Sequence, residues 1–231
     1  MPTRRKAFFS GVKAATPILL GVIPFALIAG ISAVNAGFTR AEAIGMSSIV
    51  FAGAAQLAAV DLVSQHSSTI AILLTALVIN LRFCMYSASL SPHFSGLPFS
   101  VRAVLAYLLT DQAYAVSVIA FNNERKKFKH FFYLGTALTL WVIWQTGTII
   151  GVQLGALIPS SWSLDFAVPL TFLALLFPAI VTRPALIAAV VSGVLALAAH
   201  SLPYNLGLFV AALGGIVAGY LADRGRGEHA S

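Results

Sequence analysis

The sequence is short of charged residues. Asp, Glu, Lys and Arg make up only 9% of its 231 residues, and hydrophobic residues make up 59%, whereas a soluble domain is about 25% charged. Such a chain could not cover its surface in water, which excludes a soluble globular domain. Apolar runs of about 20 residues recur along the whole length without the alternation of barrel strands. We therefore predict an all-α, polytopic membrane protein embedded as a helical bundle in the lipid bilayer.

Cysteine and catalytic motifs are scarce as well. The single cysteine, Cys84, excludes an intramolecular disulfide and has no clustered partners for a metal site. The sequence has no HExxH, no GxSxG turn and no nucleotide-binding loop, so we expect no enzyme, cofactor or metal. The net charge of +7 resides in short loops between apolar runs, which indicates orientation in the membrane rather than binding to nucleic acid.

Eight spans are predicted within a single membrane domain, 1–231. The basic connector NNERKKFKH at 122–130 divides the chain into two halves of four spans, over 1–121 and 131–222, and a tail follows at 223–231. The predicted spans are 14–33, 43–63, 69–90, 103–121, 131–158, 166–182, 185–200 and 206–222.

The distribution of basic residues predicts the orientation. With eight spans, the Lys and Arg residues of the N-terminal segment, the connector and the tail share one side, and only Arg40 and Arg102 fall on the other. Because cytoplasmic loops carry the excess of Lys and Arg, both termini, the connector and the tail are predicted to be cytoplasmic.

Glycines indicate close helix packing in span five. Gly147, Gly151 and Gly155 recur every fourth residue and so share one face of the helix. Such a face lets another helix approach closely. Packing within the chain is favoured here over a subunit interface.

Span three contains a charged residue, Arg82, two positions after Asn80. A charge at the centre of a spanning helix costs about 2.5–3.5 kcal/mol even on insertion scales, so a partner is expected. Span four supplies Asp111 at a similar predicted depth, because the two spans are antiparallel neighbours joined by a short loop. Two interpretations stay open. In the first, the charges are structural, either as an ion pair or because span three ends early with Arg82 at the interface. In the second, they handle substrate or protons.

Spans one and two contain further residues typical of a transport site. Pro17, Gly21 and Pro24 share one face of span one, and each proline removes a backbone hydrogen bond. The broken helix either faces a polar cavity, as in many transporters, or is an ordinary packing kink. In span two, Gly53 permits close backbone approach, and Gln56 offers both a donor and an acceptor. Together with the charged residues, these features suit a zwitterionic ligand in apolar surroundings.

Four segments, in this order, resemble one known family. They are PILLGVIPF, MSSIVFAGAAQLAA, VINLRFCMYSASL and LLTDQAYAV. The succession resembles the large subunit of AzlC-type branched-chain amino-acid exporters, most densely over 11–121. The resemblance implies a multi-pass protein of the bacterial inner (plasma) membrane, a secondary transporter that exports leucine, isoleucine, valine or analogues and draws on the proton motive force. It also implies a small AzlD-type membrane subunit as partner; a channel or a non-transporting structural membrane subunit is the alternative.

The resemblance extends to individual positions. Ala26 and Gln112 depart from the family pattern, which commonly has glycine and an acidic residue there. Ala26 makes the break in span one less extreme, and Gln112 leaves Asp111 as the only acid in the middle of a span. Asp111 is expected to couple protons. The expected substrate-binding residues are Gly21, Pro24, Phe25, Gly53, Gln56, Asn80 and Arg82. Gly21 is included because it lies on the proline-containing face of span one.

Overall fold

The computed structural model describes residues 3–121, 128–157, 180, 182–200, 202 and 206–227. Within these ranges every regular element is a helix, which confirms the predicted all-α class. The chain divides into two compact units, unit 1 over Met1–Val168 and unit 2 over Pro169–Ser231. The single membrane domain stays a prediction.

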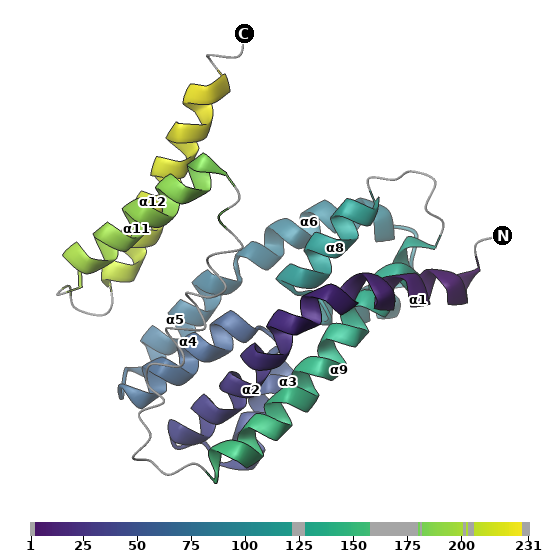
Figure 1. Ribbon diagram of the computed structural model, residues 1–231, viewed down its shortest axis with the longest axis horizontal. Helices are drawn as coiled ribbons and strands as arrows, with labels where there is room; N and C mark the ends of the chain where they lie inside the picture. Colours follow the sequence, from purple (N-terminus) through teal and green to yellow (C-terminus); the bar gives the residue numbers. More distant parts are fainter. Residues whose placement is uncertain are drawn as a thin grey trace. The chain divides into compact units, whose positions relative to one another are not determined.

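Unit 1 contains two long helices that run side by side in the same direction (Figure 1). The first consists of α1 (Arg4–Ala15), the 3-10 turn η1 (Thr16–Ile18) and α2 (Leu19–Asn35). The second is α9 (Lys129–Gly155). Their predominantly apolar sequences suit helices that cross a bilayer.

Glycines bring these two helices into contact. A Cβ on Gly135 would collide with the backbone of Phe8 in α1, and a Cβ on Gly151 would collide with the carbonyl of Leu27 in α2. Because the contacts advance in the same sense along both helices, the helices are parallel. The glycine face predicted for span five is therefore used for packing within the chain.

A third long helix of unit 1 runs the opposite way. α5 (Thr69–Asn80) and α6 (Arg82–Phe94) continue each other, with an interruption at Leu81. At the end of α6, the ring of Phe94 lies 5.4 Å from that of Tyr133 in the first turns of α9. Three helices of the described residues are long and apolar enough to cross a membrane, and they match predicted spans one, three and five: Arg4–Asn35, Thr69–Phe94 and Lys129–Gly155.

Between the first and third long helices, α3 (Arg40–Val50) and α4 (Gly53–Ser64) form a hairpin. Ala43 near the start of α3 and Val60 near the end of α4 belong to the same hydrophobic cluster. The end of α4 therefore lies at the same end of unit 1 as the start of α3. The reversal begins at Phe51, whose φ of 38° and ψ of 47° lie in the left-handed region that ends a helix.

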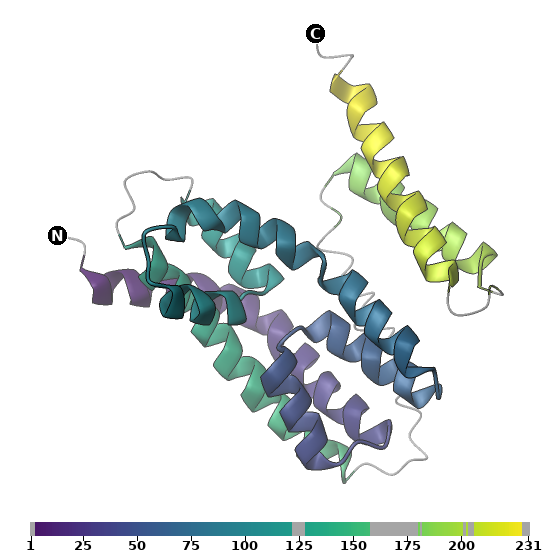
Figure 2. The same ribbon diagram turned by 180° about the vertical axis from the view of Figure 1, so that it is seen from behind.

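A second hairpin, seen from behind in Figure 2, consists of α7 (Phe99–Tyr107) and α8 (Asp111–Phe121). Tyr133 of α9 donates a hydrogen bond to the backbone of α7 at 2.9 Å. Lys129, the first residue of α9, donates to the last carbonyl of α8 at 3.2 Å. Both arms of this hairpin therefore lie near the start of α9.

The two hairpins meet at their turns. The hydroxyl of Tyr107, the last residue of α7, donates to the carbonyl of Ser48 near the end of α3. The rings of Tyr107 and Phe51 lie 6.3 Å apart. The hairpins thus enter unit 1 from opposite ends and contact each other between those ends.

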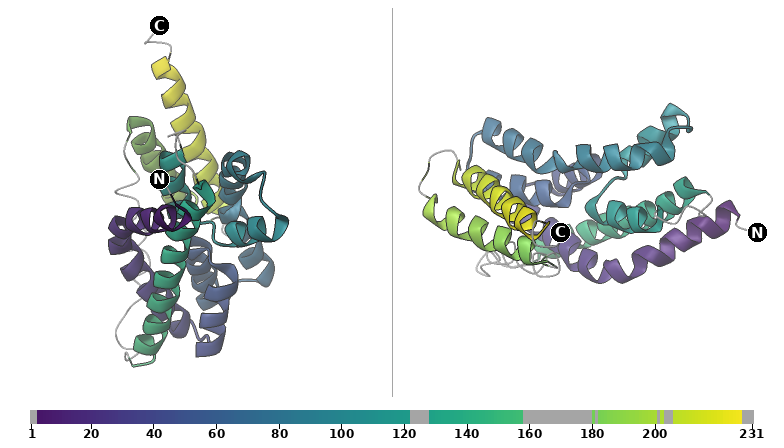
Figure 3. Two further views of the ribbon diagram at one scale, coloured as in Figure 1. Left: turned by 90° about the vertical axis from the view of Figure 1, so that its right-hand side faces the viewer. Right: turned by 90° about the horizontal axis from the view of Figure 1, so that it is seen from above.

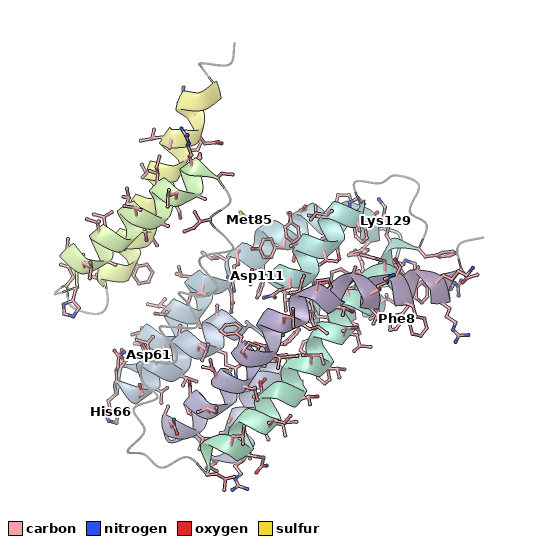
Figure 4. All side chains as sticks on the ribbon, in the orientation of Figure 1. Phe8, Asp61, His66, Met85, Asp111 and Lys129 are labelled. Carbon is pink, nitrogen blue, oxygen red and sulfur yellow. The ribbon has the colours of Figure 1, made fainter. Side chains whose placement is uncertain are left out.

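We name the two ends of unit 1 by their basic residues. The Lys129 end contains the starts of α1 and α9, and the Arg40 end contains the start of α3 and the end of α4. Figure 4 shows Lys129 at one end, Asp61 and His66 at the other, and Asp111 between them.

Two predicted spans need correction. The segments 43–63 and 103–121 are long and apolar enough for single crossing helices, but each folds back on itself. The breaks fall at Phe51–Ala52 and at Leu108–Thr110. Backbone groups freed at such breaks are tolerated at membrane depth only where protein or a water-filled cavity satisfies them. The Tyr107 hydroxyl satisfies one of them, the carbonyl of Ser48.

The correction changes the position of Arg102 but not the predicted side of the termini. Removing two crossings leaves their number even, so the common cytoplasmic side of the two termini stays a prediction. Arg102, which the sequence assigned to the opposite side with Arg40, lies beside Tyr133 near the Lys129 end. The Lys129 end therefore gains a further basic residue, which favours it as the cytoplasmic end.

The order of a long helix followed by a hairpin occurs twice in unit 1. The α1–α2 helix precedes the α3–α4 hairpin, and the α5–α6 helix precedes the α7–α8 hairpin, with the directions reversed. In the right panel of Figure 3, the long helices 4–35 (purple) and 69–94 (blue) lie on opposite sides of α8. Such inverted repeats are a common plan of secondary transporters.

Unit 2 contains two packed helices, α11 (Arg183–Ala198) and α12 (Leu206–Gly227). Gly207 lies against Ala199 just after α11, and Gly219 packs on the first turns of α11, so the two helices are antiparallel. They confirm helices at predicted spans seven and eight. Predicted span six lies almost wholly outside the described residues.

Candidate functional site

The ion pair predicted from the sequence is present in unit 1. Arg82 Nη2 lies 3.1 Å from Asp111 Oδ2. Arg82 is the first residue of α6, where the α5–α6 helix is interrupted, and Asp111 is the first residue of α8, at the turn of its hairpin. Both charges therefore sit at helix ends inside the unit. The positive end of the α8 dipole also stabilises the Asp111 carboxylate.

Two tyrosines extend the pair along α6 and α8. Tyr86 donates to Asp111 Oδ1 at 3.0 Å, and its ring stacks on Tyr114 with centroids 4.3 Å apart. Tyr114 in turn donates to Ser89 Oγ at 3.2 Å. Sequence reasoning missed both tyrosines, although Tyr86 lies one helical turn after Arg82 and Tyr114 one turn after Asp111. One oxygen of Asp111 thus binds a cation and the other a hydroxyl, so protonation of the carboxylate would release the guanidinium.

Polar atoms at the interruption of the α5–α6 helix are left without partners. Oδ1 of Asn80 and Nε of Arg82 are buried and have no hydrogen-bond partner among the described residues. Buried polar groups are normally paired, because each unmet group costs about 1–3 kcal/mol. These two atoms are therefore free to bind a polar ligand at the interruption of the α5–α6 helix.

Gln56 forms a second unpaired polar group, one turn into α4. Its side chain is 1% exposed, and neither Nε2 nor Oε1 has a hydrogen-bond partner among the described residues. The N-cap residue of α4, Ala52, contributes no side-chain hydrogen bond, so the first N–H groups of the helix are uncapped. An amide and a helix N-terminus at one hairpin turn are suited to hold a carboxylate.

Gly53 brings this turn close to two aromatic side chains. A Cβ at Gly53 would lie 2.6 Å from Trp144 Cη2 and 3.1 Å from Phe25 Cε1. The rings of Phe25 and Trp144 lie 5.3 Å apart, and both are buried. The start of α4 therefore combines unpaired polar groups with an apolar, aromatic surface.

Side chains of α9 and α7 hold the turn of the α3–α4 hairpin in place. Gln145 Nε2 donates to the carbonyl of Ser47 at 3.1 Å, and Trp144 Nε1 donates to its hydroxyl at 2.9 Å. Trp141 Nε1 donates to the Tyr107 hydroxyl at 2.9 Å. Sequence reasoning missed this role, because nothing in the spacing of these tryptophans identifies the turn that they support.

Gly21 and Pro24 lie on another face. The interruption of the first long helix falls at η1, which contains Pro17, whereas Pro24 lies inside the continuous helix α2. Gly21 and Pro24 are exposed on unit 1, whereas Phe25, one turn after Gly21, is buried. The expected substrate residues thus divide into three groups, at the ion pair, at the start of α4 and on the exposed face of α2.

Comparison with known families identifies the chain. The profile of the family described as AzlC protein matches residues 17–158. The chain belongs to the AzlC family. An uncharacterized membrane protein of Archaeoglobus fulgidus is 34% identical to it over 213 residues, which cover 90% of this chain and 92% of that protein. The inner membrane protein YgaZ of Escherichia coli K12 is 29% identical over 222 residues, covering 93% and 88% of the two chains. No solved structure matches.

Family membership fixes the general class of the protein. The AzlC family is linked to branched-chain amino-acid transport and is a family of transporters, not of enzymes. With its apolar helices and an inner-membrane homologue, this AzlC protein is a multi-pass protein of the inner membrane. The matched region lies within unit 1, which also contains the ion pair and both hairpins.

Proposed function

We propose that this AzlC protein is a secondary transporter that exports leucine, isoleucine, valine or close analogues and is coupled to the proton motive force. The observation that carries the proposal is the ion pair of Arg82 and Asp111 at two helix ends inside unit 1. Charges within a membrane are costly and typically belong to ion or substrate pathways. Many transporters present the ends of broken helices to their substrates in the same way.

The charged groups of the substrate bind at the hairpin turns in this proposal. Gln56 and the N-terminus of α4 offer donors to a carboxylate, and Arg82 offers a cation. The unpaired oxygen of Asn80 accepts from an ammonium group. Phe25, next to Gly53, supplies the apolar surface that a branched aliphatic side chain requires.

Asp111 is the proposed proton-coupling residue. While it is ionised, it holds Arg82 at 3.1 Å and accepts the hydrogen bond of Tyr86 at 3.0 Å. A proton on the carboxylate removes its charge and frees the guanidinium for the carboxylate of the substrate. Loss of that proton restores the pair and displaces the substrate. Proton and substrate movement are linked because both compete for the same positive charge.

A small AzlD-type membrane subunit is the proposed partner. The resemblance to two-component exporters supports it, and so does the exposed face of α2. Gly21 and Pro24 lie on that face beside Leu20, which is 83% exposed. In the proposal these residues line the substrate path together with the partner.

Efflux from reconstituted vesicles tests the proposal. The chain and the AzlD-type subunit are purified together, reconstituted with labelled leucine inside, and exposed to a proton gradient. We expect efflux that saturates with leucine concentration and stops when the gradient is collapsed. Flux that does not saturate and ignores the gradient would instead indicate a channel. Absence of flux from a folded, partner-bound protein would favour a structural subunit.

A further inference from the structure

A cavity of about 150 Å³ lies between α6, α7 and α9. Leu90 and Phe94 of α6, with Leu105 and Leu109 of α7 and its following turn, give it a mainly apolar lining. An engineered apolar cavity of about this volume holds a benzene molecule. The volume and lining therefore suit a four-carbon aliphatic side chain.

Polar groups also line the cavity. The guanidinium of Arg102 is exposed and has no ion-pair or hydrogen-bond partner among the described residues. The hydroxyls of Ser87 and Ser91, on α6, likewise make no hydrogen bond to a described residue. A free cation and two free hydroxyls beside an apolar floor match the carboxylate, ammonium and side chain of an aliphatic amino acid.

The cavity adjoins the ion pair through α6. Arg82, Tyr86 and Ser89 face α8 along one side of α6, where they contact Asp111 and Tyr114. Ser87, Leu90, Ser91 and Phe94 recur at helical spacing on the neighbouring side of α6, which lines the cavity. A ligand in the cavity therefore contacts the face of α6 next to the one that holds the Arg82–Asp111 ion pair. Arg102 and Tyr133 line the cavity on this side.

We propose that this cavity is a separate subsite that receives an aliphatic amino acid from the Lys129 end before it reaches the ion pair. The proposal rests on the proposed function, because it names where the exported amino acid first binds. Arg102 binds the carboxylate, the serine hydroxyls accept from the ammonium group, and the leucine-lined floor holds the branched side chain. The Lys129 end is the predicted cytoplasmic end, from which an exported substrate enters.

Protection from thiol labelling tests the subsite without requiring transport. Ser91→Cys is introduced after Cys84→Ala removes the single native thiol, and the rate of reaction with N-ethylmaleimide is measured in the purified complex. We expect leucine to slow labelling at position 91 several-fold and glycine, which lacks the side chain, to have little effect. Ser87→Cys, which lines the same cavity, serves if Ser91→Cys does not fold.

Ala88→Cys is the matched control, because it lies on α6 and is exposed but does not line the cavity. Its labelling should not change with leucine. Unchanged labelling at positions 91 and 87, or equal slowing at position 88, would overturn the subsite.

A kinetic measurement separates this inference from the proposed function. Arg102→Gln should raise the half-saturating leucine concentration for efflux about tenfold, the cost of one charge-assisted contact, with little change in maximal rate. Arg40→Gln, an arginine at the opposite end, should change neither. Normal wild-type efflux, with no protection from labelling by leucine and no change in the half-saturating concentration in Arg102→Gln, would overturn the subsite alone. Protection without any wild-type efflux would support the subsite and overturn the transport proposal.

Discussion

The guanidinium of Arg82 and the carboxylate of Asp111 lie 3.1 Å apart, each at the start of a helix. Arg82 is the first residue of α6, the second part of a long helix, and Asp111 is the first residue of α8, the second arm of a hairpin. Their side chains are 29% and 38% exposed in the isolated chain. The pair is therefore accessible to a proton or a ligand. The two opposite charges neutralise each other.

Removing one member of the pair should destabilise the protein more than removing both. Arg82→Gln leaves Asp111 without its cation and should lower the free energy of unfolding by about 1–3 kcal/mol, less than for a fully buried pair because both side chains are partly exposed. The double variant Arg82→Gln with Asp111→Asn should recover part of that loss. Thermal unfolding in detergent measures both. A double variant less stable than either single variant would contradict the pairing energetics.

Replacing Gln56 should separate stability from transport. Gln56→Leu removes two buried amide atoms that have no partner among the described residues, so stability should stay equal or rise by about 1 kcal/mol. Leucine efflux should fall strongly because the donor to the carboxylate is lost. Unfolding and efflux are measured on the same preparation. A clear loss of stability would show that the amide has a structural partner and would contradict its role as a free ligand group.

The contact between the two hairpin turns should contribute to stability. Tyr107→Phe removes the donor to the Ser48 carbonyl and the acceptor of Trp141, and it should cost about 1–2 kcal/mol. Tyr220→Phe is the control, because Tyr220 is 63% exposed on α12. Chemical unfolding of both variants provides the comparison, and equal stabilities would show that the turns do not depend on this contact.

Close packing of α2 on α9 predicts intolerance to a single methyl group. Gly151→Ala would push a Cβ into the Leu27 carbonyl, and such overpacking should cost about 1–3 kcal/mol. Gly45→Ala in α3 has no atom of the described residues within 4 Å of the added Cβ, so it should be neutral or stabilising by up to about 1 kcal/mol. Similar thermal stabilities of the two variants would contradict the parallel helix contact.

The ion pair could be predicted from the sequence because the physics leaves few alternatives. Arg82 lies in an apolar run where an unpaired charge is costly, and Asp111 is the acid in the middle of the next apolar run. The glycine face of α9 was predictable for a similar reason, since regular spacing of small residues places them on one side of a helix. The partners of that face, α1 and α2, required the structure.

The hairpins could not be predicted from hydropathy alone. A run such as 103–121 has the length and composition of a crossing helix, and nothing in that average reveals a reversal. A local signal did exist in this run. Thr110 accepts from the N–H of Ala113 at 3.3 Å, and a threonine followed by an acid is typical of a helix start. The left-handed Phe51 has no such signal, because neither proline nor glycine occupies the position.

The prolines of span one illustrate the opposite error. Two prolines suggest two breaks, yet the 3-10 turn occurs around Pro17, and Pro24 is accommodated within α2. A proline removes one hydrogen bond but does not by itself determine whether the helix continues. Packing of the buried face of α2 on α9 maintains the helix through Pro24.

Comparing gradient-driven efflux with leucine exchange in Asp111→Asn tests the central claim most directly. The variant is reconstituted with its partner, and both fluxes are measured beside the wild type. The account predicts that leucine exchange across the membrane, which needs no net proton movement, persists, while efflux driven by the proton gradient is lost. Gradient-driven efflux at the wild-type rate in Asp111→Asn would contradict the assignment of proton coupling to this pair.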